Sequence, residues 1–224
     1  MLESKLIVDS CIHLPSQWFK QNVVAGAFFD QPDKPMTLKI SKSTKLSEKT
    51  ETAPAIKAPA RAMVAGTNTK ESKEHRNFQW LGWWGGAISQ VVRHKDVLTG
   101  PMSGCWIVVY RRDGMEYVAH IGKNKDNKAQ TDAVIAGWNN YAQHHAADII
   151  CGFNPRRHWL GREPHPNALT DNGIYQCFAL VTRDPNPRLF SVLTQRQKVD
   201  SNLLRIVGIE EVPSENADTL QHTD

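Results

Sequence analysis

The sequence predicts an α+β fold, a mainly antiparallel β-sandwich with peripheral helices. Two observations support this prediction. Short runs rich in β-branched and aromatic residues recur along the chain between glycine, proline, asparagine and aspartate, which is the pattern of strands joined by turns. By contrast, one long segment, residues 131–147, carries apolar residues at helical spacing.

Strand-like runs lie toward both ends of the chain. We expect strands within residues 6–8, 23–29 and 36–40, and again within residues 175–182, 189–193 and 203–212. Residues 36–40 alternate apolar and polar side chains, which is typical of a half-buried strand.

A β-hairpin is predicted between residues 104 and 122. An apolar run at residues 106–110 is followed by Asp113-Gly114, a strong hairpin-turn signal, and then by a return run at residues 115–121. Because side chains alternate along a strand, Val118 and His120 should share one face of the return strand.

The predicted helix covers residues 131–147. Its apolar side chains recur every three or four residues, at Val134, Ile135, Trp138, Tyr141 and Ala142. Thr131 or Asp132 would cap its first turn, and Gly137 is a cost to helix stability in its interior.

The length of the chain fits one domain with a good core, and we interpret residues 1–224 as a single catalytic domain. Residues 41–76 contain no aromatic side chain and cannot bury enough apolar surface to offset their ordering entropy. We expect a flexible low-complexity loop inserted within one sheet, or a linker behind a small N-terminal piece. The polar residues 213–224 are expected to fray.

Composition excludes little but favours an ordinary globular protein, with 40% hydrophobic and 22% charged residues. The net charge of +4 comes from scattered residues and does not favour nucleic-acid binding. We expect no membrane span and no signal peptide, because the chain shows neither a long apolar run nor a basic segment before an apolar one. The cysteines are widely spaced, which favours free thiols: Cys11, Cys105, Cys151 and Cys177.

Cys105 and His120 form the candidate catalytic pair. A cysteine nucleophile needs a nearby base, and histidine suits this role because its pKa lies near neutrality. Cys105 precedes the first hairpin strand and His120 lies near the end of the second, so the turn should bring them within hydrogen-bond reach. Ser103-Gly104 would leave space for a substrate carbonyl and supply backbone N–H groups for an oxyanion hole.

A family resemblance adds to this interpretation. Ser103-Gly104-Cys105, the apolar strand after it, and His120 within Tyr117-Val118-Ala119-His120-Ile121-Gly122 resemble the catalytic core of the cytotoxic necrotizing factor deamidases. The related Burkholderia lethal factor family has Leu-Ser-Gly-Cys followed by histidine, and Met102 stands here in the place of that leucine. Trp80-Leu81-Gly82-Trp83 is similar to a Trp-Leu-Pro-Trp stretch in that group, and Thr99 lies at the offset of an assisting threonine. The resemblance is confined mainly to residues 80–122.

The resemblance implies a toxin or effector that converts a glutamine of a host protein to glutamate through a thioester. Cys105 would be the nucleophile, His120 the base and Thr99 an assisting group, while Ser103, Gly104 and Trp83 would bind substrate. Members of the family act on Rho-type GTPases or on a translation-initiation helicase, and they use no metal or organic cofactor. We therefore expect a monomeric secreted effector that acts in host cytoplasm, without a membrane or nucleic-acid partner.

Two other classes stay open. A papain-like cysteine peptidase or peptidoglycan amidase would place its cysteine at a helix N-terminus, with the histidine far downstream. A non-catalytic β-sandwich binding module would bury Cys105 in the core and use Thr99 as a turn residue before Gly100-Pro101. An activated Cys105 should react with alkylating reagents faster than the other three cysteines.

Two further clusters have weaker claims to function. The first cluster contains His144, His145, Asp148 and Cys151. It lacks the ligand spacing of a zinc site and is better explained as solvated residues at a helix end. The second cluster contains Arg156, Arg157, His158, Arg162 and His165 around Trp159. It is better explained as a proline-rich surface loop than as a site for an acidic partner or a nucleic-acid phosphate.

Overall fold

The fold is described from a computed structural model. The structure describes residues 2–14, 19–20, 23–31, 36–42, 73–124, 126–145, 147–166, 171–198, 200–215 and 220.

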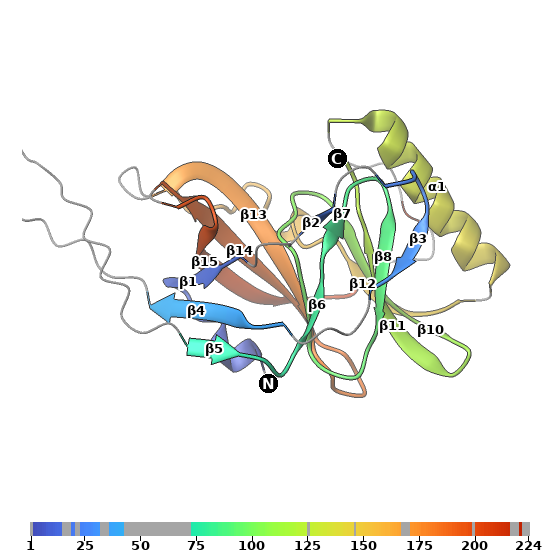
Figure 1. The fold of residues 1–224 in the computed structure, drawn as a ribbon, viewed down its shortest axis with the longest axis horizontal. Coiled ribbons are helices and arrows are strands. Elements are labelled where there is room, and N and C mark those ends of the chain that lie inside the picture. Colours follow the sequence, from blue (N-terminus) through green and yellow to red (C-terminus); the bar gives the residue numbers. More distant parts are fainter. Residues whose placement is uncertain are drawn as a thin grey trace, which may run out of the picture.

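Two large β-sheets, one two-stranded sheet and one α-helix form the core elements of the described residues (Figure 1). The larger sheet has the order β5 (Lys73–His75), β4 (Leu38–Lys42), β1 (Ser10–His13), β15 (Leu203–Val212), β14 (Leu189–Gln197), β13 (Asp171–Val181), β9 (Val97–Thr99) and β6 (Gln79–Leu81). The smaller sheet has the order β12 (Asp148–Phe153), β10 (Trp106–Arg112), β11 (Met115–Ile121), β8 (Ile88–Val92) and β3 (Phe28–Asp30). A short pair joins β2 (Phe19–Lys20) to β7 (Trp83–Trp84), and 3₁₀ turns occur at Glu3–Lys5 and Arg157–Trp159.

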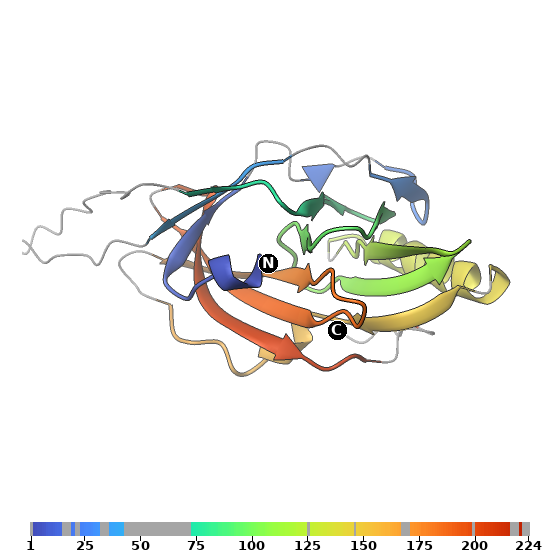
Figure 2. The same cartoon turned by 90° about the horizontal axis from the view of Figure 1, so that it is seen from below.

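Most neighbouring strands are antiparallel. The parallel pairs among the described strands are β6–β9, β3–β8 and β2–β7. The long helix α1 (Lys128–His144) lies on the outer side of the smaller sheet, and the second view shows the two sheets as separate layers (Figures 1 and 2). The predicted α+β, mainly antiparallel and sandwich-like architecture is therefore confirmed.

Three apolar clusters hold these layers together. The central cluster lies between the sheets and includes Ile107, Val118 and Leu193. The second covers the opposite face of the larger sheet, and the third lies between the smaller sheet and α1, around Trp138. Burial of these apolar surfaces is the main favourable term for the fold.

The hairpin prediction is confirmed. β10 pairs with β11 from Trp106↔Ile121 to Arg112↔Met115. The two turn residues, Asp113 and Gly114, have φ values of 51° and 76°, as a two-residue hairpin turn with both central residues at positive φ requires. The predicted strand at residues 203–212 is also observed, and the strands predicted at 175–182 and 189–193 are longer than expected, at 171–181 and 189–197.

The N-terminal strands were predicted a few residues too early. Ile7 and Val8 are 59% and 46% exposed, and the strand begins at Ser10, after Asp9 adopts a φ of 66°. A positive φ interrupts an extended strand, so pairing with β15 starts only beyond it. The runs at 23–29 and 36–40 shift in the same direction, to Phe28–Asp30 and Leu38–Lys42.

The helix begins three residues earlier than predicted. Its N-cap is Asn127, whose side chain accepts a hydrogen bond from the Gln130 N–H. The capping role expected of Thr131 or Asp132 is therefore wrong, and the Thr131 hydroxyl bonds to the backbone of Asn124 instead. Gly137 is required by packing, because a Cβ there would lie 2.9 Å from the Gly26 carbonyl oxygen.

The described parts of both segments predicted to be flexible contact the folded domain, and residues 41–42 and 73–75 do so as strands. β4 and β5 are antiparallel neighbours, with Leu38 opposite His75, so residues 41–42 and 73–75 belong to the larger sheet. Residues 43–72 lie outside the described residues. In the tail expected to fray, Ser214 and Glu215 bond to Gly152, while Leu220 is only 3% exposed and bonds to Asn139. These three residues thus have partners in the fold, and residues 216–219 and 221–224 are outside the described set, so fraying of the tail stays a prediction.

Candidate functional site

Hairpin register places Cys105 and His120 on one face of the smaller sheet. His120 is directly opposite Ile107, and Trp106 is opposite Ile121. Cys105 therefore lies one step beyond this pairing and is a diagonal neighbour of His120. Ile107 and Val118 alternate onto the same face and belong to the central core. The predicted common face is thus observed.

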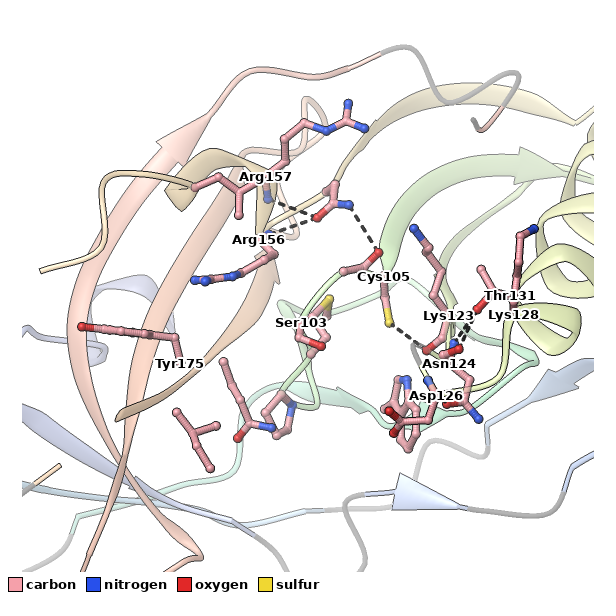
Figure 3. Close-up of a pocket in the computed structure, with 18 of the residues that line it drawn as sticks. Ser103, Cys105, Lys123, Asn124, Asp126, Lys128, Thr131, Arg156, Arg157 and Tyr175 are labelled. Atoms are coloured by element: carbon pink, nitrogen blue, oxygen red, sulfur yellow. Dashed lines mark hydrogen bonds between the residues drawn. The ribbon is translucent and has the colours of Figure 1, made fainter. Parts of the chain in front are cut away.

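Cys105 borders an open cleft of about 840 Å³ at this end of the molecule (Figure 3). Three residues predicted to bind substrate also line it: Ser103, Gly104 and Trp83. The opposite walls come from the 156–176 region and from the start of α1, as Figure 3 shows for Tyr175 and Lys128 on either side of Ser103 and Cys105. His120 and Thr99 are not in the cleft lining, because both are fully buried behind it.

The thiol of Cys105 is neutral in this structure. Its side chain is only 2% exposed, and burial raises its pKa to about 12. The Lys123 backbone and the Trp83 side chain oppose this shift only in part. The thiol donates to the Lys123 carbonyl oxygen at 3.9 Å, a contact that favours its protonated form. Cys151 is less deeply buried, and burial raises its pKa only to about 11. Faster alkylation of Cys105 than of the other cysteines therefore stays a prediction for an activated state.

The imidazole of His120 is also neutral. Complete burial lowers its pKa to about 3, and the nearby Gly82 carbonyl counteracts this only weakly. That carbonyl already accepts the Ser89 hydroxyl at 2.9 Å. At hydrogen-bonding distance and angle, neither ring nitrogen of His120 has a partner among the described residues. The expected thiol–imidazole hydrogen bond is therefore not formed, although the two side chains share a face.

Thr99 has a structural role here. Its hydroxyl donates to the Gly100 carbonyl oxygen at 3.1 Å and accepts from the Ala179 N–H at 2.9 Å. The first bond is to the next residue in the chain, and the second ties β9 to β13. Because neither bond involves His120, the assisting role predicted for Thr99 has no support in this geometry. The geometry fits the alternative role, in which the Thr99 hydroxyl forms hydrogen bonds with nearby backbone groups.

Asn154 is a site residue that the sequence did not reveal. It follows β12 directly, is buried, and donates from Nδ2 to the Gly104 carbonyl oxygen at 3.3 Å. Its Oδ1 accepts from the backbone N–H groups of Arg156 and Arg157. An asparagine between an apolar run and a proline was the only available signal, and such residues more often satisfy a local turn.

Gly104 contributes space rather than an unusual backbone conformation. Its φ is not in the left-handed region, and an added Cβ would meet no atom within 4 Å. The room beside the sulfur that the sequence predicts is therefore present. Gly122 is different, since a Cβ there would clash with the Trp84 carbonyl oxygen at 2.1 Å.

The structure does not support the candidate zinc cluster or the basic 156–165 loop as a binding site. No group of three potential metal ligands occurs among the described residues, and His144 and His145 are exposed. Several cations of the 156–165 loop are engaged in internal ion pairs, with Glu163, Glu215 and Glu210. Within the described chain, no helix is long and apolar enough to cross a membrane. Cys105 precedes a strand rather than a helix, unlike a papain-type nucleophile.

Comparison of the chain with protein-family models, with curated proteins and with solved structures finds no match. The likeness to the deamidase toxins therefore consists of the motifs between residues 80 and 122. In space, these motifs do converge: Trp83 is hydrogen-bonded to Cys105, and Gly82 lies beside His120.

Proposed function

We propose that this chain is a cysteine-dependent protein-glutamine deamidase, with Cys105 as nucleophile and His120 as general base. The supporting observation is the buried, unpartnered imidazole beside a thiol at the edge of a cleft. A buried polar group without a partner costs about 1–3 kcal/mol. Such a group calls for an explanation, and a base awaiting a proton from Cys105 supplies one.

The protonation states suit a base-assisted attack from a neutral pair. His120 is free of a proton at any pH well above 3 because burial lowers its pKa, so one ring nitrogen offers a lone pair. Cys105 keeps its proton because burial raises its pKa. Proton transfer from Sγ to His120 would therefore accompany attack on the substrate rather than precede it.

In the first step, Sγ bonds to the carboxamide carbon of a glutamine while His120 takes the thiol proton. The tetrahedral oxyanion would be stabilised by peptide N–H groups of the Ser103–Cys105 turn. The carbon–nitrogen bond then breaks, and His120 returns the proton so that ammonia leaves and a thioester forms. In the second half, water adds to the thioester with His120 again as base, which yields glutamate and restores the thiol.

A protein substrate fits the shape and chemistry of the cleft better than free glutamine. Its volume of about 840 Å³ far exceeds one carboxamide. Leu160 and Ile174 stand at one wall with about half of their surfaces exposed, and Lys128 and Asp132 stand at the other. Such mixed surfaces are typical of protein–protein contacts. A host protein, such as a Rho-type GTPase or a translation factor, and action as a secreted monomeric effector are part of this proposal.

Mass spectrometry of host-cell lysate tests the proposal. Lysate incubated with the unmodified protein should contain a glutamine that gains about one dalton, the mass signature of this reaction class. The gain should vanish with Cys105→Ser and persist with Cys177→Ser, which alters another buried thiol outside the cleft lining. Persistence of the mass shift with Cys105→Ser would contradict the mechanism.

A non-catalytic β-sandwich binding module is the second candidate. The observation that favours it is the raised pKa of Cys105, together with the missing hydrogen bond between thiol and imidazole. In that case the cleft binds a partner without changing it. The lysate experiment separates the two, because a binding module produces no deamidated glutamine even as the unmodified protein.

A further inference from the structure

Asn154 joins three separate segments at the rear of the cysteine turn. Its side chain holds the Gly104 carbonyl, and its own N–H donates to Glu215 Oε1 at 3.1 Å. Glu215 in turn donates its backbone N–H to the Gly152 carbonyl oxygen at 2.6 Å and pairs with Arg157 at 2.8 Å. The segment after β15 thus lies along the end of β12, and its Glu215 side chain bonds to the backbone of Asn154.

The bond to Gly104 has a consequence for Cys105. The peptide unit is planar and trans, so its C=O and N–H point in opposite directions. Asn154 lies at the end of β12, and β11 lies on the other side of β10. Holding the Gly104 carbonyl toward Asn154 therefore directs the Cys105 N–H toward the side of Lys123, whose carbonyl also receives the thiol (Figure 3).

The other contacts of this turn do not set the orientation of the peptide between Gly104 and Cys105. The turn is fixed upstream by the paired backbone bonds of Met102 and Cys177, both at 2.8 Å. Gly104 itself has no neighbour within 4 Å of an added Cβ and no left-handed φ that would restrict the turn. The Asn154 donor is thus the contact among the described residues that acts on the peptide between Gly104 and Cys105 from the β12 side.

We propose that Asn154 is a positioning residue that aims the Cys105 N–H and thiol, with Glu215 holding Asn154 in place. The catalytic part of this proposal rests on the proposed deamidase function. An N–H donor misplaced by about 1 Å can lower turnover about a hundredfold. Loss of the Asn154 bond should therefore lower kcat more than it alters substrate binding.

Two variants separate the contributions of the side chain. Asn154→Asp keeps an oxygen for the N–H groups of Arg156 and Arg157 but loses the donor to Gly104, whereas Asn154→Ala loses both. Asn139→Ala is the matched control. The Asn139 side chain also bonds to backbone groups, in two hydrogen bonds with Leu220, and it lies on the helix and away from the cleft lining.

The readouts are kcat and KM on the lysate protein identified above, and the rate of iodoacetamide labelling at Cys105 relative to Cys177. Both Asn154 variants should lower kcat about 10- to 100-fold with KM changed less than about threefold. They should also raise the Cys105 labelling ratio at least about threefold, because a loosened turn exposes the sulfur. Asn139→Ala should lower the melting temperature without moving either readout.

Asn154 variants that match Asn139→Ala in both readouts would overturn the inference. If Cys105→Ser is inactive and Asn154→Asp retains full kcat, positioning fails while the deamidase proposal stands. If Cys105→Ser is fully active, the deamidase proposal and the catalytic part of this one fall together. The labelling ratio then decides whether Asn154 holds the turn at all.

Discussion

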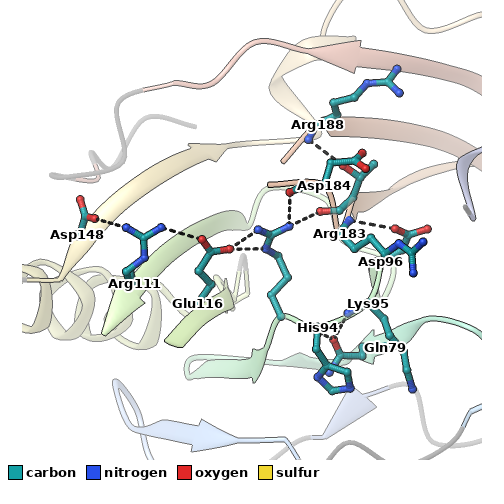
Figure 4. Close-up of polar contacts among 12 residues, drawn as sticks. Gln79, His94, Lys95, Asp96, Arg111, Glu116, Asp148, Arg183, Asp184 and Arg188 are labelled. Atoms are coloured by element: carbon teal, nitrogen blue, oxygen red, sulfur yellow. Dashed lines mark hydrogen bonds and ion pairs between the residues drawn. The ribbon is translucent and has the colours of Figure 1, made fainter. Parts of the chain in front are cut away.

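The two ends of the β10–β11 hairpin bury a nitrogen-containing side chain in opposite ways. At the turn end, the Arg93 side chain is almost fully buried and donates to Glu116 and to the carbonyl oxygens of Thr182 and Asp184 at 2.7 and 2.9 Å. Figure 4 shows two of these acceptors, Glu116 and Asp184. At the open end, His120 is fully buried with no hydrogen-bond partner.

The difference separates a structural device from a candidate catalytic one. Arg93 links the β8–β9 connection, the hairpin and the β13–β14 turn, and its charge is matched by Glu116. Glu116 also pairs with Arg111, which continues the network to Asp148. His120 carries no charge and makes no ion pair or hydrogen bond with the described residues beyond its contact with the Gly82 carbonyl, so its burial makes no comparable contribution to stability. A buried group that is left unsatisfied is a better functional candidate than one that is fully bonded.

The largest expected effect is on turnover at the open end. Cys105→Ser and His120→Gln should each lower kcat at least about 10⁴-fold, because nucleophile and base act as one unit. The double variant should be no worse than either single one. Cys177→Ser should retain turnover per folded molecule, and full activity of Cys105→Ser would show that the open end is not a catalytic site.

At the turn end, the largest expected effect is on stability. Arg93→Met should lower the free energy of unfolding by about 3–5 kcal/mol, because it leaves Glu116 and two carbonyl groups without their partner. Arg111→Met, which removes a pair from the same Glu116 but at a side chain 48% exposed, should cost at most about 1 kcal/mol. Urea denaturation measures both. Equal losses of unfolding free energy in the two variants would mean that the buried contacts of Arg93 do not stabilise this end of the hairpin.

Acid should destabilise the open end through His120. Its pKa is about 3 in the folded protein against 6.5 as the ordinary value, so the unfolded chain binds the proton more tightly. Stability is then fully present above pH 6.5 and falls by about 1.4 kcal/mol for each pH unit below it, until the folded ring also titrates. At pH 5 the loss is about 2 kcal/mol. His120→Gln should remove this component, and an unchanged pH slope would contradict a buried neutral ring.

Thr99 gives the smallest expected effect. Thr99→Val should lower the melting temperature by about 2–6 °C, since a hydroxyl with two backbone bonds is worth about 1–2 kcal/mol. Turnover per folded molecule should stay the same. Thr99→Ser keeps the hydroxyl and is the control. A loss of kcat at unchanged melting temperature would restore the assisting role that sequence had suggested.

Sequence predicted the local half of the site. The Asp113-Gly114 turn and the alternation of the flanking runs determine the hairpin, and these features place Cys105 and His120 on one face before any tertiary contact is known. Burial and its effect on the two pKa values were not predictable in the same way, because they depend on how the larger sheet covers that face.

The long-range half of the site left no periodic signal in the sequence. Asn154 lies 50 residues from Gly104, Thr99 lies 80 from Ala179, and Arg93 lies 91 from Asp184. Each contact joins a polar side chain to a backbone group, and any residue type supplies that backbone group. The early placement of the N-terminal strands has a related cause, since partners in β15 and the φ of Asp9 decide where β1 begins.

The protonation state of His120 is the most direct test of the contrast between the two ends. Imidazole ¹⁵N chemical shifts can be followed by NMR from about pH 4 to about pH 8 in the unmodified protein and in Cys105→Ser. We predict the pattern of a neutral ring across this whole range, because burial holds the pKa near 3. Titration near the ordinary value of 6.5, or an imidazolium at neutral pH that Cys105→Ser abolishes, would contradict a neutral resting pair and would indicate a preformed thiolate–imidazolium pair.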